Sequence, residues 1–480
     1  MKLKLTIFFI LAFTITGHSL AQERMISMGD SIPPIPYSQF VEKNIIIMDI
    51  TTVNGEFPTC DYIDSPPNGW GKSITNNFKV PGRMKISWGE NLLYDSGDYA
   101  EGISGMTIRI RGNSSAYAPA KPYKIDLQKK ADLLFRNNPS YNDKDWVLIR
   151  DIYQNAMIGY ETCTLLGMQW TPSYGYVSLI LNDEYMGLYM LVESVKRNTN
   201  CRINITKQGF LFEYDSYWWT QDYHIPSALY NMMRYTVKYP DPLTASDKQY
   251  LEQRISEYET SVLNGTYDQQ IDVPSLAKWC LGLDILGIND AAGANRFLTL
   301  YDRNSKIVVP TMWDFDSAEK YGDIWSRTHR VLMKQFFENQ NISFRRQFVE
   351  EWEQISETFV TDLNTVLLRY RNSDKGLALF NACDFENIRW NHANNFRSNI
   401  IDHIEWLGKR KRWIDKRIQD YYLTGDANRD WIVDVEDINI MINMILGLMP
   451  TNLKQADVNG DKIVDVEDVN IVINKILKLQ

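Results

Sequence analysis

The sequence predicts an α+β protein with a two-lobed domain over residues 22–422 and a small all-α domain over residues 425–480. Three observations predict this class. Short runs of β-forming residues dominate residues 44–127, helical spacing dominates residues 325–422, and a repeated segment begins at Gly425. The chain has 480 residues, of which 44% are hydrophobic, so it is long enough to bury more than one core.

The first residues have the features of a secretory signal peptide. Lys2 and Lys4 precede an apolar stretch over residues 5–15, and a Ser-Leu-Ala exit follows at residues 19–21. We therefore expect residues 1–21 to be removed and the mature chain to be secreted, at a bacterial cell surface or in an extracellular complex. No later apolar stretch approaches the roughly 18 to 20 residues that a membrane span needs.

Net charge and cysteine spacing argue against a nucleic-acid partner and against a zinc site. The net charge of -9 disfavours a nucleic-acid partner, because nucleic-acid binding needs a basic surface. The five cysteines lack the CxxC spacing of a zinc site, and at most two ordinary disulfides could form among them: Cys60, Cys163, Cys201, Cys280 and Cys383.

In the first half we expect mainly strands, then a helix and a hairpin. The apolar spacing of residues 156–167 predicts the helix. Asn182-Asp183-Glu184 supplies turn residues between two apolar runs and predicts the hairpin. The expected strands are residues 45–50, 79–88, 106–111, 122–127, 176–181 and 185–192.

The C-terminal repeat carries oxygen ligands at the spacing of a calcium loop. Two copies lie 31 residues apart, and each runs into an apolar helix, residues 438–446 or 469–479. Loop positions 1, 3, 5, 9 and 12 offer side chains and position 7 a backbone carbonyl, the spacing that surrounds a hard cation. An acidic surface turn is the alternative, but it does not explain two copies in register. The predicted ligands of two Ca²⁺ ions are Asp426, Asn428, Asp430, Ile432, Asp434 and Asp437, then Asp457, Asn459, Asp461, Ile463, Asp465 and Asp468.

Residues 425–480 resemble a type I dockerin, a calcium module that attaches enzymes to cohesin-bearing scaffold proteins. Each unit has a loop and one helix but no entering helix, and Trp431 and Lys462 replace the glycine usual at position 6 of an EF-hand loop. The resemblance implies a cohesin partner. Val435-Glu436 and Val466-Glu467 stand at the partner-choosing positions and differ from the Ser-Thr pair of the best-known binders.

A second set of oxygen ligands surrounds the segment TMWDFDSAEK. A predicted helix over residues 274–287 leads to a polar loop with Asp290 and Asn295, and a hairpin over residues 296–311 leads to Asp314 and Asp316. A protein kinase uses this order: an Asp that orients the acceptor hydroxyl, an Asn that holds metal, and an Asp after a hairpin that holds the metal bridging the phosphates. We assign these roles to Asp290, Asn295 and Asp314, with Asp316 as a further ligand or a neighbour of the ligands.

Residues 108–127, IRIRGNSSAYAPAKPYKIDL, lead from a strand through a Gly-Asn-Ser-Ser loop to a strand with lysines. Backbone amides and hydroxyls of such a loop can cover phosphates, and a lysine on the next strand can pair with them. The same residues are also typical of an ordinary turn.

Together these motifs resemble the spore-coat protein H (CotH) family of atypical secreted kinases, through RGNSS, KPY, NDEYMGLYMLVE and WDFD as they stand here. The resemblance covers about residues 40–420. It implies a two-lobed, atypical protein-kinase-like fold, with a β-rich N-lobe and a helical C-lobe, that uses ATP with Mg²⁺ or Mn²⁺. It implies Lys121 as the lysine that pairs with phosphate and Lys124 as second choice. It also implies Glu193 near the adenine, and phosphate contacts from Arg111, Asn113 and Ser114. The chain departs from protein kinases in having no His-Arg-Asp before the predicted base, no Gly after Asp314-Phe315 and no GxGxxG.

Three functions fit the sequence. The first is a secreted kinase that is docked to a scaffold and phosphorylates a protein. The second is a non-catalytic CotH-like structural or binding module of a cellulosome-like assembly. The third is a glycosyltransferase with Asp314-Phe315-Asp316 as its DxD metal motif, although no doubly wound βα pattern precedes it. Trp218 and Trp219 could offer a stacking platform for a polysaccharide, or could belong to the core.

Overall fold

The computed structural model describes residues 23–67, 69, 71–230, 232–288, 295–320, 322–326 and 331–478. The predicted signal peptide and Asp290 therefore lie outside the described residues. Among the helices of these ranges, none combines the length and the apolar character needed to cross a lipid bilayer.

The first half of the chain forms a sheet that closes into a barrel-like structure. Its strand order is β3-β11-β12-β10-β9-β8-β6-β7, and a further pairing between β3 and β6 joins the two sides. All pairs are antiparallel except β3 with β11. The strands are β3 (Ile46–Thr52), β6 (Val80–Trp88), β7 (Asn91–Asp95), β8 (Met106–Ile110), β9 (Tyr123–Ala131), β10 (Asp143–Ile149), β11 (Tyr174–Leu181) and β12 (Glu184–Glu193).

Apolar side chains at alternate positions of the strands fill the interior of the barrel. Ile108 and Ile110 on β8, Ile125 on β9 and Trp146 on β10 belong to one buried cluster. Because successive strand residues point to opposite faces, their neighbours point out of the barrel. Short elements flank the barrel: β1 (Met25–Ile26), β2 (Ile35–Pro36), α1 (Tyr37–Glu42), β4 (Asp61–Asp64) and β5 (Lys72–Thr75).

The hairpin β11–β12 has the turn that its sequence predicts. Asn182 and Asp183 adopt φ of 51° and 60°, the left-handed conformation that two-residue hairpin turns need and that Asn and Asp tolerate. Asn182 also accepts a hydrogen bond from Thr52 N at 2.9 Å. The turn is thereby attached to the end of β3.

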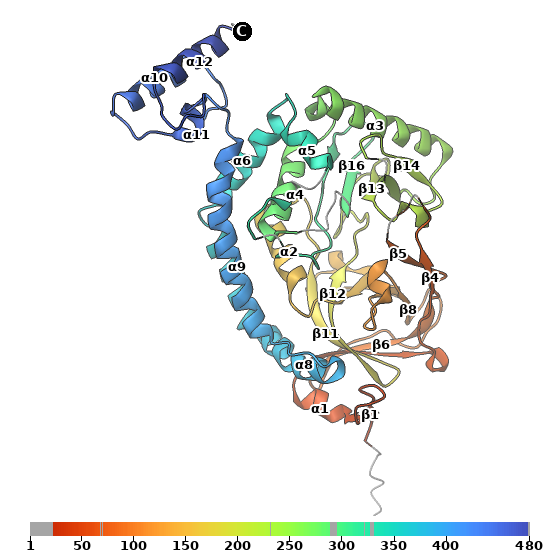
Figure 1. Ribbon diagram of the computed structural model, residues 1–480. Coiled ribbons are helices and arrows are strands. Elements are labelled where there is room, and N and C mark those ends of the chain that lie inside the picture. The colour runs from red at the N-terminus through yellow and green to blue at the C-terminus, as the bar shows by residue number, and fades with distance from the viewer. Residues whose placement is uncertain are drawn as a thin grey trace, which may run out of the picture.

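A second sheet of five strands lies beside the barrel, next to α3 (Figure 1). Its order is β14-β15-β13-β16-β17, and helices α2, α3 and α4 pack near it in the main core. These elements are β13 (Phe210–Asp215), β14 (His224–Pro226), β15 (Arg234–Tyr239), β16 (Arg296–Leu300), β17 (Ile307–Val308), α2 (Asn155–Leu165), α3 (Ala245–Asn264) and α4 (Val273–Leu286).

Helices dominate the C-terminal part, as predicted. Figure 1 shows α9 running along one side of the molecule, with a small helical unit beyond its end. Helices α5 to α9 cover residues Val331–Phe337, Ser343–Ile355, Phe359–Arg371, Asp374–Trp390 and Phe396–Arg417. The small unit has its own buried cluster and contains α10 (Val435–Ile445), α11 (Leu453–Ala456) and α12 (Val466–Ile476).

The return strand is shorter than the expected residues 306–311, because only Ile307–Val308 pairs with β16. Val309 N instead donates to Ser275 Oγ at 3.1 Å, and Pro310 has no N–H to donate. The repeat helices begin three residues earlier than expected, at Val435 and Val466.

The fold is thus mixed α+β, with a barrel-like sheet and C-terminal helices. Its mainly antiparallel sheets differ from the doubly wound parallel sheet of nucleotide-binding α/β folds.

Candidate functional site

The structure brings Asn295 and Asp314 into direct contact. Asn295 Nδ2 donates to Asp314 Oδ2 at 2.9 Å, and the two residues have φ of 56° and 73°. Non-glycine residues adopt such values at small cost only when they are Asn or Asp, so the residue types suit the backbone. The hydrogen bond uses the amide nitrogen and leaves Asn295 Oδ1 as an oxygen that can bind metal.

The segment that carries Asp314 is fixed by aromatic packing. Phe315 is buried, and its ring meets Tyr160 edge-on at a centroid distance of 5.1 Å. A Cβ atom at Gly159 would lie 2.3 Å from the Phe315 ring. Helix α2 can therefore approach the segment this closely only because residue 159 is a glycine.

Arg111 lies beside the same segment. It follows β8, and its N–H extends the β8–β9 ladder by donating to Pro122 O at 3.1 Å. Its guanidinium carbon is 5.8 Å from the centre of the Trp313 ring. Burial lowers the pKa of Arg111, and the nearby carboxylates of Asp314 and Glu213 oppose that effect. The resulting site holds a cation next to the predicted metal ligand.

One face of the second sheet adds charged residues that the sequence reasoning missed. Lys238 Nζ on β15 lies 3.0 Å from Glu213 Oε2 and 3.9 Å from Asp215 Oδ2 on β13. Glu213 is opposite Phe297, two residues after Asn295, so this face continues toward the Asn295–Asp314 pair. Burial raises the pKa of Glu213, whereas for Lys238 the two carboxylates outweigh burial and raise the pKa.

The sequence itself indicates this charged face of the second sheet. Glu213 and Asp215 stand at alternate positions of the otherwise apolar run Phe210–Asp215. Charged groups at such positions are costly unless they are paired, so two of them in one strand indicate a polar face with partners.

The outer face of the barrel supplies the other side of the site. Arg109 on β8 is opposite Lys124 on β9, and both point outward like Arg111, since their neighbours fill the barrel. Lys124 Nζ lies 3.0 Å from Asp145 Oδ1 and 3.3 Å from Asp126 Oδ1. Of the two predicted lysines, Lys124 is thus on the same face as Arg111.

Lys121 contacts the loop before it. Its Nζ donates to Tyr62 Oη at 2.6 Å and to Ala116 O at 3.0 Å. Asn113 Oδ1 accepts a hydrogen bond from Ser73 Oγ at 2.7 Å, and Ser114, which begins a 3-10 turn, is exposed. The Gly-Asn-Ser-Ser loop is therefore held by its own lysine and by the β4–β5 hairpin.

Glu193, predicted near the adenine, is buried at the end of β12. Its carboxylate pairs with Arg202 and, at 2.7 Å, with Arg136, and it accepts from Ser173 N at 3.0 Å. These contacts satisfy the carboxylate within the protein. Trp218 is also buried, with the Arg234 guanidinium 3.8 Å from its ring centre, so it offers no open face to a sugar.

The Asn295–Asp314 pair fits a magnesium or manganese ion as far as its donor atoms are concerned. Mg²⁺ takes oxygen ligands and is often bound by one or two carboxylates together with substrate phosphates and water. Over the described ranges, no three His, Cys, Asp or Glu side chains gather at one point, and such a magnesium site does not need three. Asp316, the other predicted ligand, is exposed, and the neighbouring Asn155 donates to its backbone carbonyl at 3.4 Å.

The two C-terminal loops repeat the same hydrogen bonds. Asp426 accepts from the N–H groups of Asp430 and Trp431 at 3.1 and 2.9 Å, and Asp457 accepts from Asp461 and Lys462 at 3.1 and 2.8 Å. These bonds fold each chain segment around its first carboxylate.

The last two predicted ligands of each loop lie at the start of a helix. Asp434 and Asp437 form a capping box at the start of α10, and Asp465 and Asp468 do the same for α12. Trp431 and Lys462, at the usual glycine position, adopt φ of 71° and 75° and so keep the turn. The backbone shape and the oxygen donors fit calcium.

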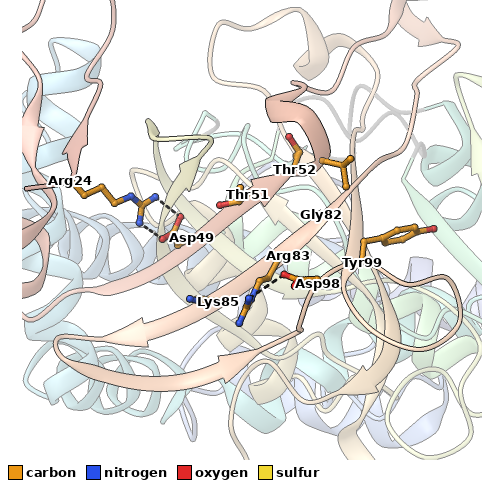
Figure 2. A pocket seen from close by; sticks show the side chains of 10 residues that line it. Arg24, Asp49, Thr51, Thr52, Gly82, Arg83, Lys85, Asp98 and Tyr99 are labelled. Atoms are coloured by element: carbon orange, nitrogen blue, oxygen red, sulfur yellow. Dashed lines mark hydrogen bonds and ion pairs between the residues drawn. The ribbon is translucent and has the colours of Figure 1, made fainter. Parts of the chain in front are cut away.

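A cavity of about 510 Å³ lies elsewhere, on the β3–β6 side of the barrel (Figure 2). Figure 2 shows Arg24 facing Asp49 and Arg83 facing Asp98 along its wall. None of the predicted site residues lines it. Its charges largely neutralise one another, and we assign it no role.

Two family models match the chain. Residues 108–367 match the family described as CotH kinase protein, and residues 424–477 match the dockerin type I domain. A search of curated proteins gave no match. The first match spans more than half of the chain and includes Arg111, Lys121, Lys124, Asn295 and Asp314.

Proposed function

We propose that this chain, which belongs to the CotH kinase protein family, is a secreted kinase that transfers phosphate from ATP to a protein hydroxyl. The observation that carries the proposal is the 2.9 Å hydrogen bond between Asn295 and Asp314 beside Arg111. The hydrogen-bonded pair places an amide oxygen and a carboxylate next to a cation. These are the groups that a metal-bound triphosphate needs.

In this proposal Asp314 and Asn295 hold Mg²⁺ or Mn²⁺, which neutralises charge on the β- and γ-phosphates when bound. Arg111 donates hydrogen bonds to phosphate oxygens, and its planar guanidinium suits them. Lys124 replaces Lys121 as the preferred phosphate-pairing lysine, because it shares the outer barrel face with Arg109 and Arg111.

Asp290 takes the proton of the acceptor hydroxyl. The freed oxygen forms a bond to the γ-phosphorus, the bond to the bridging oxygen breaks, and ADP leaves with that electron pair. We assign this role from the sequence order, since Asp290 lies outside the described residues.

The dockerin type I match implies two calcium ions and a cohesin partner for residues 425–480. In this proposal the module attaches residues 22–422 to a cohesin-bearing scaffold outside the cell. The acceptor is a surface or scaffold-assembly protein.

Calorimetry of ATP binding with and without Mg²⁺ tests the proposal. Asp314→Asn keeps a residue that tolerates positive φ and removes the charge, so metal-dependent binding should be lost. Asp323→Ala removes an exposed carboxylate of the same segment and should leave binding unchanged. Asp290→Ala should spare binding but stop phosphate transfer.

One observation favours the non-catalytic alternative. Arg111 and Lys238 already lie close to the carboxylates of Asp314, Glu213 and Asp215, as they also would in a purely structural cluster. If ATP with Mg²⁺ or Mn²⁺ did not bind the full chain, this alternative would replace the kinase proposal.

A further inference from the structure

The first calcium loop of the dockerin module is in contact with the CotH domain. Trp431, at loop position 6, stacks on Tyr422 with ring centres 5.1 Å apart and an interplanar angle of 21°. Only 8% of the Trp431 surface is exposed, and its side chain belongs to the main core of the molecule. The Tyr422 hydroxyl donates in turn to Glu353 on α6.

Further polar contacts join the same surfaces. Lys454 Nζ on α11 lies 2.7 Å from Asp420 Oδ1 and 3.0 Å from Lys416 O. Gln455 Nε2 donates to Gln419 O at 3.1 Å. Several independent contacts therefore hold the dockerin module at the end of α9.

Arg429 strengthens the junction from within the first loop. Its guanidinium carbon lies 5.0 Å from the centre of the Tyr422 ring, and Nη2 donates to Gln455 Oε1 at 3.3 Å. Tyr422 is thus contacted by two residues of the loop, one on each side of the predicted ligand Asp430.

Trp431 belongs both to the calcium loop and to this junction. Its backbone N–H donates to the carboxylate of Asp426, the first predicted calcium ligand, at 2.9 Å. Its ring meanwhile packs on Tyr422 outside the loop. A change in the loop that moves this backbone amide must also move the ring, because the residue is held in one strained conformation at φ 71°.

The second loop provides an internal comparison. Lys462 has the same loop position and nearly the same φ, 75°, and its N–H bonds Asp457 in the same way. Its side chain, however, is exposed. The two loops therefore share their ligand scaffold and differ at position 6, where Trp431 packs on Tyr422 and Lys462 is exposed.

We infer that calcium binding in the first loop is coupled, through Trp431, to docking of the dockerin module on the CotH domain. Coupling between two equilibria is reciprocal, so docking strengthens calcium binding at loop one and calcium strengthens docking. Scaffold attachment would then fix the orientation of the CotH domain. The inference depends on calcium loading of the dockerin and does not depend on phosphate transfer.

Calcium titration of the full chain by calorimetry tests this inference. Tyr422→Leu removes the stacking partner from outside both loops, and should weaken one of the two binding steps by about tenfold, within the usual range of allosteric coupling. Trp431→Lys, which copies the second loop, should weaken the same step. Lys462→Ala is the matched control and should leave that step unchanged.

X-ray scattering gives a second readout. With calcium, the wild-type chain should have a smaller maximum dimension than Tyr422→Leu, and circular dichroism should confirm that the variant is folded. Glu353→Ala acts from α6 and should shift binding in the same direction. Unchanged calcium affinity in Tyr422→Leu, or an effect seen with Trp431→Lys alone, would refute the coupling. A chain that bound no calcium would contradict both the coupling and the dockerin assignment.

Discussion

Asn295 and Asp314 are hydrogen-bonded at 2.9 Å although they lie 19 positions apart in the sequence, with a hairpin between them. Both residues adopt positive φ, so each backbone position is suited to the residue type that the chemistry needs. The hairpin β16–β17 thereby turns two separate polar residues into one pair of oxygen donors.

The contact between Asn295 and Asp314 leads to a prediction about nucleotide binding. Asn295→Gly accepts the positive φ but loses the amide, so metal-dependent ATP affinity should fall by about tenfold to a hundredfold, as for groups that support a metal ligand. Calorimetry with Mg²⁺ measures this. Asn54→Gly, at an exposed position with φ 59°, is the control. Equal affinities for the two variants would mean that Asn295 does not support the metal site.

The two candidate lysines can be separated by substitution. Lys124→Met should weaken ATP binding, because Lys124 shares a barrel face with Arg109 and Arg111. Lys121→Met should mainly lower thermal stability, since Lys121 Nζ holds the carbonyl of Ala116. The opposite pattern in calorimetry and thermal unfolding would restore Lys121 as the phosphate-pairing residue.

Gly159→Ala should disturb the site from a distance. Its Cβ would meet the Phe315 ring at 2.3 Å, and overpacking of this kind costs about 1 to 3 kcal/mol. Urea unfolding should show that loss, together with weaker metal-dependent ATP binding, because Phe315 stands next to Asp314. Gly408→Ala in α9 would meet only Arg412 Nη1 at 3.8 Å and should be neutral or raise stability by up to about 1 kcal/mol.

His403 predicts a pH dependence of stability. Its Nδ1 is 2.6 Å from Glu319 Oε1 and its Nε2 is 2.6 Å from Tyr153 O, so both ring nitrogens face acceptors, which favours the doubly protonated ring. Burial alone would lower the pKa of His403, but the Glu319 hydrogen bond and charge, with a smaller effect of Asp151, raise it.

Because the folded pKa is raised, the stabilisation is fully present below the unfolded pKa of about 6.5 and is lost as pH rises through the folded pKa. The difference in unfolding free energy between wild type and His403→Gln should therefore be larger at pH 6 than at pH 9. Urea unfolding at both values measures it. A difference that grew with pH would show that His403 is neutral in the folded protein.

Removing calcium should destabilise the C-terminal module. The clustered carboxylates of each loop repel one another until a cation neutralises them, so binding and folding are linked. EDTA should lower the helical signal of the full chain and excess Ca²⁺ should restore it. Asp457→Ala should reduce the calcium-dependent part of that change, whereas a helical signal that ignored both EDTA and calcium would contradict the calcium sites.

Some features of this protein follow from local sequence. Asn182-Asp183 specifies the β11–β12 turn because these residues tolerate positive φ, and the ligand spacing of the repeat is visible since its donors are neighbours in sequence. The order of Asn295, the hairpin and Asp314 was likewise predictable, although the return strand was too long in the prediction. The family matches agree with the resemblances drawn from these motifs.

Tertiary structure decided what depends on which face a side chain occupies. Lys121 and Lys124 are three residues apart, but only Lys124 points outward beside Arg109, because closure of the barrel by β3 and β6 defines an inside and an outside. Glu213 and Lys238 meet because β13 pairs with β15, which no local pattern specifies. Trp431 could be recognised as an unusual calcium-loop residue, but its contact with Tyr422 depends on how the module packs at the end of α9.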